Sequence, residues 1–194
     1  MITNDLQLIE EPKKILSMNP KKFILWLFMA SIIMLFAAMT SAYIVRQSEG
    51  NWLDFELPGL FWITTIIILL SSLTMHWGYI SAKRDNLETT KTAMIITTLL
   101  GILFLVGQYL GWGALVDQDV YFIGNPSGSF LYVLTGLHGA HIIAGILFLL
   151  IILRATFKYE VHSKNMNLME MGVTFWHFLG GLWLYLFMFL LLNR

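Results

Sequence analysis

The chain has 194 residues, of which 57% are hydrophobic and only 12% are charged. Soluble domains are usually about half apolar and about a quarter charged, so this composition, with a mean hydropathy of +0.71, is typical of a membrane protein. Basic and acidic residues balance at 12 each, which gives no support for nucleic-acid binding. The absence of cysteine excludes disulfides and thiolate metal sites.

Residues 1–22 form a polar tail of mixed charge, interrupted by Pro12 and Pro20. The tail has no hydrophobic segment of the kind that a cleavable signal peptide needs, so we expect none. A short amphipathic helix around Leu6 to Leu16 would lie on the membrane or on a partner. We therefore divide the chain into a cytoplasmic tail, residues 1–22, and a membrane domain, residues 23–194.

Five hydrophobic runs follow, each near or above the roughly 20 residues that a helix needs to cross a bilayer. None of them contains aspartate, glutamate, lysine or arginine. Strand-like alternation is absent, and a lone strand could not satisfy its backbone in lipid. The sequence therefore predicts an all-α, polytopic bundle of five transmembrane helices, at Phe23–Val45, Leu60–Ala82, Thr92–Leu115, Phe130–Leu153 and Met171–Leu192.

The basic residues divide unequally between the two sides of this five-span arrangement. One side has only Arg46 and Arg194, together with most of the acids of the connecting loops. Because cytoplasmic loops are rich in lysine and arginine, we expect the N-terminus inside and the C-terminus outside. The basic residues on the cytoplasmic side are Lys13, Lys14, Lys21, Lys22, Lys83, Arg84, Lys91, Arg154, Lys158 and Lys164.

Histidines and one amide are the functional candidates within the spans, since intramembrane polar residues are costly and usually have a role. His138 and His141, in LTGLHGAHIIAG, share one face of a helix. They could bind one metal ion between them, but two axial haem ligands would need His141 and a residue such as His177. Hydrogen bonds to neighbouring helices, a haem, and a metal or proton relay all remain open. The full set is His76, Gln108, His138, His141 and His177, with Glu170 at the mouth of the last helix and His162 in a solvated loop.

Other functions find less support in the residues. No catalytic triad, nucleotide-binding loop or zinc spacing is present. A small transporter would be expected to have an intramembrane carboxylate or an inverted repeat, and neither is evident. The pattern favours one subunit of a larger assembly.

Two motifs resemble subunit III of haem–copper terminal oxidases. One is TGLHGAH at residues 135–141, followed by Gly145; the other is Glu170 followed by WHF at 176–178 and Trp183. Gln108 and Trp112, and the stretch WLFMAS at 26–31, are similar to further motifs of that family. The resemblance covers about residues 20–194 and matches the short, five-helix form of the subunit.

The resemblance implies an accessory, non-redox role with no catalytic residue, cofactor or metal ligand in this chain. Haem and copper would lie in partner subunits of a proton-pumping cytochrome c oxidase or a related quinol oxidase, which reduces oxygen to water. The chain would pack against subunit I, beside subunit II, in the cytoplasmic membrane of a bacterium. It would also bind phospholipid and assist proton uptake, and the resemblance allows membership of a respiratory supercomplex.

This sequence departs from the family pattern at three intramembrane acid positions, which are Ile32, Gly111 and Gly180 here. Glu170 is then the only acid near the membrane, and we expect it to bond to His141 or His177. We expect interhelical polar roles for His138, His141, Glu170, Trp176, His177 and Gln108. The alternative function is a di-haem membrane anchor of a quinone-linked dehydrogenase, which is also a five-helix protein with intramembrane histidines.

Overall fold

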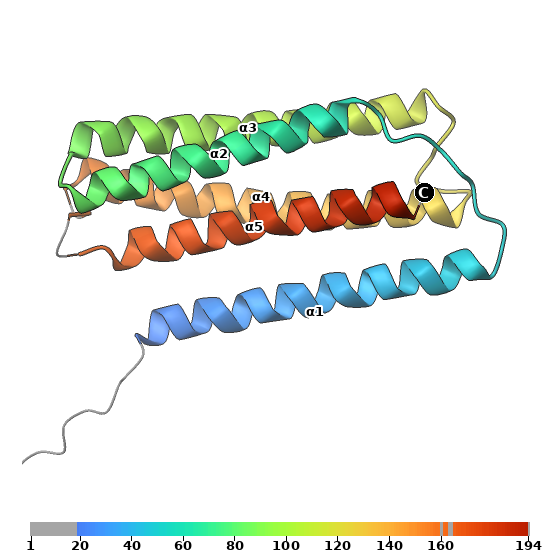
Figure 1. Cartoon of the computed structure of the whole chain (residues 1–194), viewed down its shortest axis with the longest axis horizontal. Helices are drawn as coiled ribbons and strands as arrows, with labels where there is room; N and C mark the ends of the chain where they lie inside the picture. Colours follow the sequence, from blue (N-terminus) through green and yellow to red (C-terminus); the bar gives the residue numbers. More distant parts are fainter. Residues whose placement is uncertain (1–18, 160, 163–164, 194) are drawn as a thin grey trace, which may run out of the picture.

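The computed structural model describes residues 19–159, 161–162 and 165–193. Within them the prediction of an all-α chain of five helices is confirmed, and each helix is long and apolar enough to cross a membrane. The expected amphipathic helix at residues 6–16 lies outside the described residues. The helices are α1 (Pro20–Ser48), α2 (Leu60–Lys83), α3 (Leu87–Val116), α4 (Pro126–Phe157) and α5 (Asn167–Leu192) (Figure 1).

Several helices begin earlier than the hydrophobic runs because asparagines cap them. Asn86 Oδ1 accepts a hydrogen bond from the backbone N–H of Thr89, so α3 begins at Leu87 rather than at residue 92. Asn125 caps α4 in the same way, through the N–H of Ser127. A side-chain oxygen that pairs with these otherwise unpaired N–H groups stabilises a polar first turn. Hydropathy alone cannot detect such a turn.

Four of the helices form a closed group, to which α1 is added at one side (Figure 1). α2 packs on α3, α3 on α4, α4 on α5, and α5 on α2. Among the described residues, α1 contacts α4 and α5 but neither α2 nor α3. We call α2–α5 the four-helix group.

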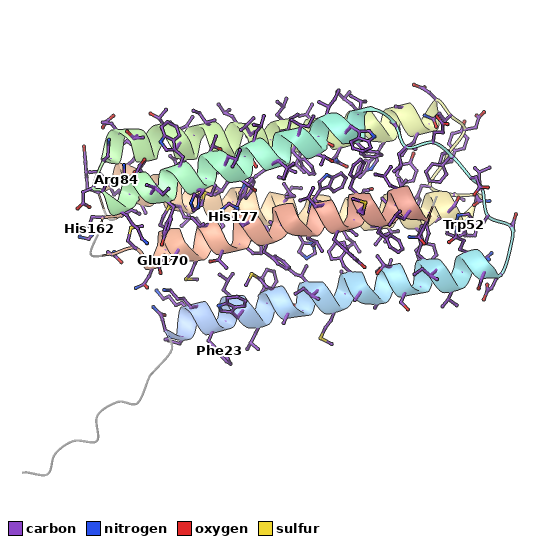
Figure 2. The ribbon with its side chains drawn as sticks, viewed as in Figure 1. Phe23, Trp52, Arg84, His162, Glu170 and His177 are labelled. Carbon is purple, nitrogen blue, oxygen red and sulfur yellow. The ribbon has the colours of Figure 1, made fainter. Side chains whose placement is uncertain are left out.

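The α1–α2 connection crosses the end of the molecule where α4 begins (Figure 1). Asn125 Nδ2 donates to the carbonyl oxygen of Asn51 at 3.2 Å, and Ser127 Oγ donates to that of Leu53 at 2.9 Å. Trp52 lies at this end, whereas Arg84 and Glu170 lie at the opposite end (Figure 2). The basic connections therefore gather at one end of the bundle, which is the arrangement that the charge pattern predicts; which end is cytoplasmic stays a prediction.

Candidate functional site

Trp176 lies at the centre of the four-helix group and contacts all of its helices. A Cβ atom added to Gly101 of α3 would lie 2.7 Å from its Cη2 atom, and one added to Gly145 of α4 would lie 3.2 Å from its Cζ3 atom. Its Nε1 atom donates to Ser71 Oγ of α2 at 3.1 Å. The two glycines thus form a slot for the indole, and the hydroxyl of Ser71 fixes its orientation.

Two further hydroxyls of α2 accept hydrogen bonds from neighbouring helices. Gln108 Nε2 of α3 donates to Thr64 Oγ1 at 2.9 Å, and Trp183 Nε1 of α5 donates to Thr65 Oγ1, also at 2.9 Å. Each threonine hydroxyl donates its own proton to the carbonyl oxygen of Phe61. Their oxygens are therefore free to accept from the neighbouring helix, as in other membrane helix pairs.

His138 does not make the interhelical hydrogen bond that we expected. Its side chain is fully buried, and neither ring nitrogen has a hydrogen-bond partner among the described residues. Aromatic rings surround it, with the ring centroids of Trp183, Phe104 and Phe36 at 5.3, 5.9 and 6.5 Å. The imidazole therefore interacts with the faces and edges of these rings.

His141 bonds within its own helix rather than across to another one. Its Nδ1 atom lies 2.7 Å from the carbonyl oxygen of Leu137. A carbonyl oxygen only accepts, so this nitrogen carries the proton. The ring also lies beside Phe36 of α1, at a centroid distance of 5.7 Å. The interhelical contact of His141 is therefore aromatic and not a hydrogen bond.

Glu170 bonds to neither of the histidines that we expected. Lys22 Nζ of α1 donates to Glu170 Oε2 at 2.5 Å, and both side chains are about one-third exposed. His177 instead faces His76 of α2, with ring centroids 6.1 Å apart. Lys22 lies in the polar tail, close to the first span, and the chain offers several lysines at this end. The sequence therefore gave no reason to select it over His141.

The three positions at which the resemblance led us to expect an acid lie in packing contacts. Ile32 is buried between α1 and its neighbours. A Cβ atom on Gly111 would lie 3.1 Å from Phe61 Cε1, and one on Gly180 would lie 3.1 Å from Ser72 Oγ. A carboxylate at either glycine would require its neighbour to move.

The described residues contain no group of three or more histidine, aspartate or glutamate side chains placed to bind a metal ion. His162 is exposed near the start of α5. Sequence reasoning missed Thr64, Thr65 and Trp183 as interhelical polar residues. The run of hydroxyl residues in the second hydrophobic segment could have indicated these threonine hydrogen-bond acceptors, but we gave that run little weight.

Comparisons with known proteins agree with the arrangement of the helices. The family model of cytochrome c oxidase subunit III matches residues 15–193, which include all five helices. Cytochrome c oxidase subunit 3 of Corynebacterium diphtheriae is 27% identical over 168 residues, or 82% of each chain. Cytochrome bo(3) ubiquinol oxidase subunit 3 of Buchnera aphidicola is 27% identical over 179 residues, or 90% of this chain and 95% of its own.

A relative from an animal is more similar over a shorter length. Cytochrome c oxidase subunit 3 of Petromyzon marinus is 32% identical over 133 residues, which are 69% of this chain and 49% of its own. The matches give no support to a di-haem anchor, and that alternative is not retained.

Proposed function

Because the chain belongs to the cytochrome c oxidase subunit III family, we propose that it stabilises the oxygen-reducing subunit of a haem–copper oxidase by packing against it. The chain is an accessory subunit of an oxidase, and its relatives include subunits of a cytochrome c oxidase and of a ubiquinol oxidase. The proposal covers both classes, because the electron donor would bind to other subunits.

The observation that chiefly supports a structural role is the use of polar side chains within the four-helix group. Trp176, Trp183 and Gln108 each donate to a hydroxyl of α2. These groups fix how the helices pack, and they do not converge on a common cavity. Such contacts in membranes contribute on average about 0.6 kcal/mol each, so together they determine geometry more than stability.

We further propose that no acid within these helices supplies protons to the oxidase. The positions where the resemblance implies an acid are Ile32, Gly111 and Gly180 here. Glu170, in the first turn of α5, forms an ion pair with Lys22. Lys22 Nζ donates a hydrogen bond to Glu170 Oε2, so this carboxylate already has a partner on another helix. Its role would then be to join α1 to α5.

The test measures protons taken up per electron in the assembled complex with the Glu170→Gln variant. We expect turnover and proton stoichiometry per assembled complex to equal those of the parent. The control is Glu88→Gln, which removes an ion pair within α3, with Lys91 at 2.9 Å, at the same end of the bundle. A complex that assembles normally but takes up fewer protons with Glu170→Gln alone would show that this carboxylate handles protons. Ile32→Glu is the reverse change, and a rise in proton uptake would show that this position supplies protons only when it has an acid, as the proposal expects.

Phospholipid binding and membrane topology are further parts of the proposal. A cleft of about 910 Å³ lies between the end of α1 and the start of α4, with Ala38, Ala42, Val45 and Phe130 in its apolar wall and Arg46 near one end. An apolar wall beside a guanidinium suits an acyl chain and its phosphate group. We place the basic end of the bundle in the cytoplasm, in the inner membrane of a bacterium, with subunits I and II as neighbours in the complex.

A further inference from the structure

Two imidazoles lie on an outer surface of the bundle at membrane depth. His76 of α2 is exposed, and His177 of α5 is half-buried and lies between α5 and α2 (Figure 2). Among the described residues neither ring has a hydrogen bond, although the two rings are 6.1 Å apart. We define the imidazole face as His76 and Ser72 of α2 together with His177, Gly180 and Gly181 of α5.

The position of these rings along the helices makes contact with hydrocarbon costly. His76 precedes the end of α2 by seven residues and His177 follows the start of α5 by ten. At 1.5 Å per residue these are roughly 10 and 15 Å from the helix ends. Polar side chains at such depth usually face protein or a water-filled cavity and pair with a partner. An unpaired imidazole facing acyl chains would lose its hydrogen bonds to water and gain none.

The surface next to the imidazoles permits a close approach. Ser72 and His76 are one turn apart on α2, as are His177 and Gly181 on α5. The two helices approach closely here, because a Cβ atom added to Gly180 would lie 3.1 Å from Ser72 Oγ. A Cβ atom on Gly181 would have no atom within 4 Å. Small residues of this kind let the backbone of another helix come near in membranes.

The outer surfaces of α3 and α4 differ from the imidazole face. Their exposed side chains are long and aliphatic at the corresponding depth. Acyl chains suit such a surface, because it presents no unpaired polar atom. Examples are Ile95, Ile96 and Leu99 of α3, and Leu147, Leu150 and Ile151 of α4.

We propose that the imidazole face is the docking site for a transmembrane helix of a partner subunit, and that this helix presents a hydrogen-bond acceptor to His76 and His177. The acceptor is a carboxylate, a hydroxyl or an exposed carbonyl oxygen, since a neutral imidazole donates one N–H. An acyl chain has no such atom at this depth. The proposal rests on the proposed function and adds the place and the chemistry of the contact.

The test uses the complete complex, with an affinity tag on this chain. Gly181→Leu adds a side chain whose Cβ atom meets no described atom within 4 Å, and His76→Leu removes the exposed donor. The matched control is Gly113→Leu, because Gly113 of α3 is also exposed and a Cβ atom there has no atom within 4 Å. The readouts are the amount of this chain in the membrane and the haem absorbance that co-purifies with it in mild detergent.

We expect Gly181→Leu and His76→Leu each to lower co-purified haem by about tenfold, while Gly113→Leu matches the parent. The proposal is overturned if both variants retain haem as the control does. It is also overturned if Gly181→Leu keeps the complex intact and loses only a bound lipid in native mass spectrometry. If the unmodified chain brings no haem protein out of the membrane, the proposed function fails, and this proposal fails with it.

A second experiment distinguishes a partner subunit from another copy of this chain. The chain has no cysteine, so Leu73→Cys, at an exposed position one turn before His76, creates a single thiol beside the imidazole face and keeps both imidazoles. We expect a reagent with one thiol-reactive end and one photoreactive end to cross-link it to a different subunit of the complex. A cross-linked dimer of this chain as the main product would overturn the proposal in favour of self-association.

Discussion

The four-helix group and α1 are held by contacts of different kinds. Inside the group, the indole of Trp176 lies in a slot between Gly101 and Gly145, and its N–H is bonded to Ser71. One side chain therefore contacts three other helices. Because any larger residue in the slot would meet the indole, the relative positions of α2–α5 depend on this one arrangement.

α1 is joined to α4 and α5 at several separated points, with clefts beside it. Phe36 covers both His138 and His141 near the middle of the helix. A cleft of about 380 Å³ lies between α1 and α5, and the larger one lies towards α4. Among the described residues, the polar contacts are the Lys22–Glu170 ion pair, the Thr40–Tyr185 bond at 2.8 Å, and the bonds from Tyr43 and Gln47 to Asn193 at 2.8 and 3.1 Å.

This difference shows which contacts determine how α2–α5 are arranged and which contacts only attach α1 to them. Burying a large aromatic side chain in a close-fitting site contributes several kcal/mol, whereas a polar contact between membrane helices contributes on average about 0.6 kcal/mol. The four-helix group has the first kind at its centre. α1 has no such slot, and its buried apolar residues lie along one face of the helix, so we expect it to separate first. These residues are Met29, Ile32, Phe36 and Tyr43.

The largest effect is expected from Trp176→Ala. The change leaves a cavity between Gly101 and Gly145 and should destabilise the chain by about 3–5 kcal/mol. The measurement is the midpoint of thermal unfolding in detergent, with Trp77→Ala as the control because Trp77 is exposed. Trp176→Phe keeps most of the ring and should cost much less. Equal midpoints for Trp176→Ala and the control would show that the slot does not determine the stability of the group.

An intermediate effect that is confined to α1 is expected from Phe36→Ala. The lost packing should cost about 3 kcal/mol and should release α1 while the four-helix group stays folded. Cysteines introduced at Ala37 and Leu182, which line the cleft between α1 and α5, report this as slower disulfide formation. Met34→Ala, on the exposed side of α1, should leave the rate unchanged. If α1 and the four-helix group unfolded together in a single transition, the result would contradict the expectation that α1 separates first.

The smallest effect is expected from Tyr43→Phe. Tyr43 donates to the carbonyl oxygen of Asn193, but Gln47 Nε2 donates to the same oxygen at 3.1 Å. The acceptor therefore stays paired, and the ring keeps its contacts with Trp52 and Phe189. We expect a loss of about 0.6 kcal/mol, measured as above by thermal unfolding. If Tyr43→Phe lowered the free energy of unfolding as much as Phe36→Ala does, polar contacts and not packing would be what attaches α1.

The helices were predictable from the sequence, and their polar partners were not. Length, apolar composition and the positions of lysine and arginine define five spans, because a bilayer requires about 20 apolar residues and internal backbone hydrogen bonds. The helix starts at Leu87 and Pro126 were missed, since the capping asparagines precede polar first turns. Hydropathy does not report such turns.

Helical periodicity predicts which residues share one face of a helix. It does not identify the side chain that faces them from the neighbouring helix. Gln108 and Trp176 were predicted as interhelical polar residues, and both donate to hydroxyls of α2. His138 and His141 were predicted in the same way, yet they meet aromatic rings and their own backbone. The choice between these outcomes depends on the rotation and depth of the facing helix, which no single segment specifies.

The sequence alone determined that this chain is a five-helix membrane protein with one basic end, and its motifs indicated the family. Only the tertiary structure decided that Glu170 pairs with Lys22, that Trp176 lies between two glycines, and that His76 and His177 are left facing outward. The physical reason is that hydrophobicity acts on each segment independently. A hydrogen bond or a steric slot, in contrast, requires two or more segments to meet at a fixed distance.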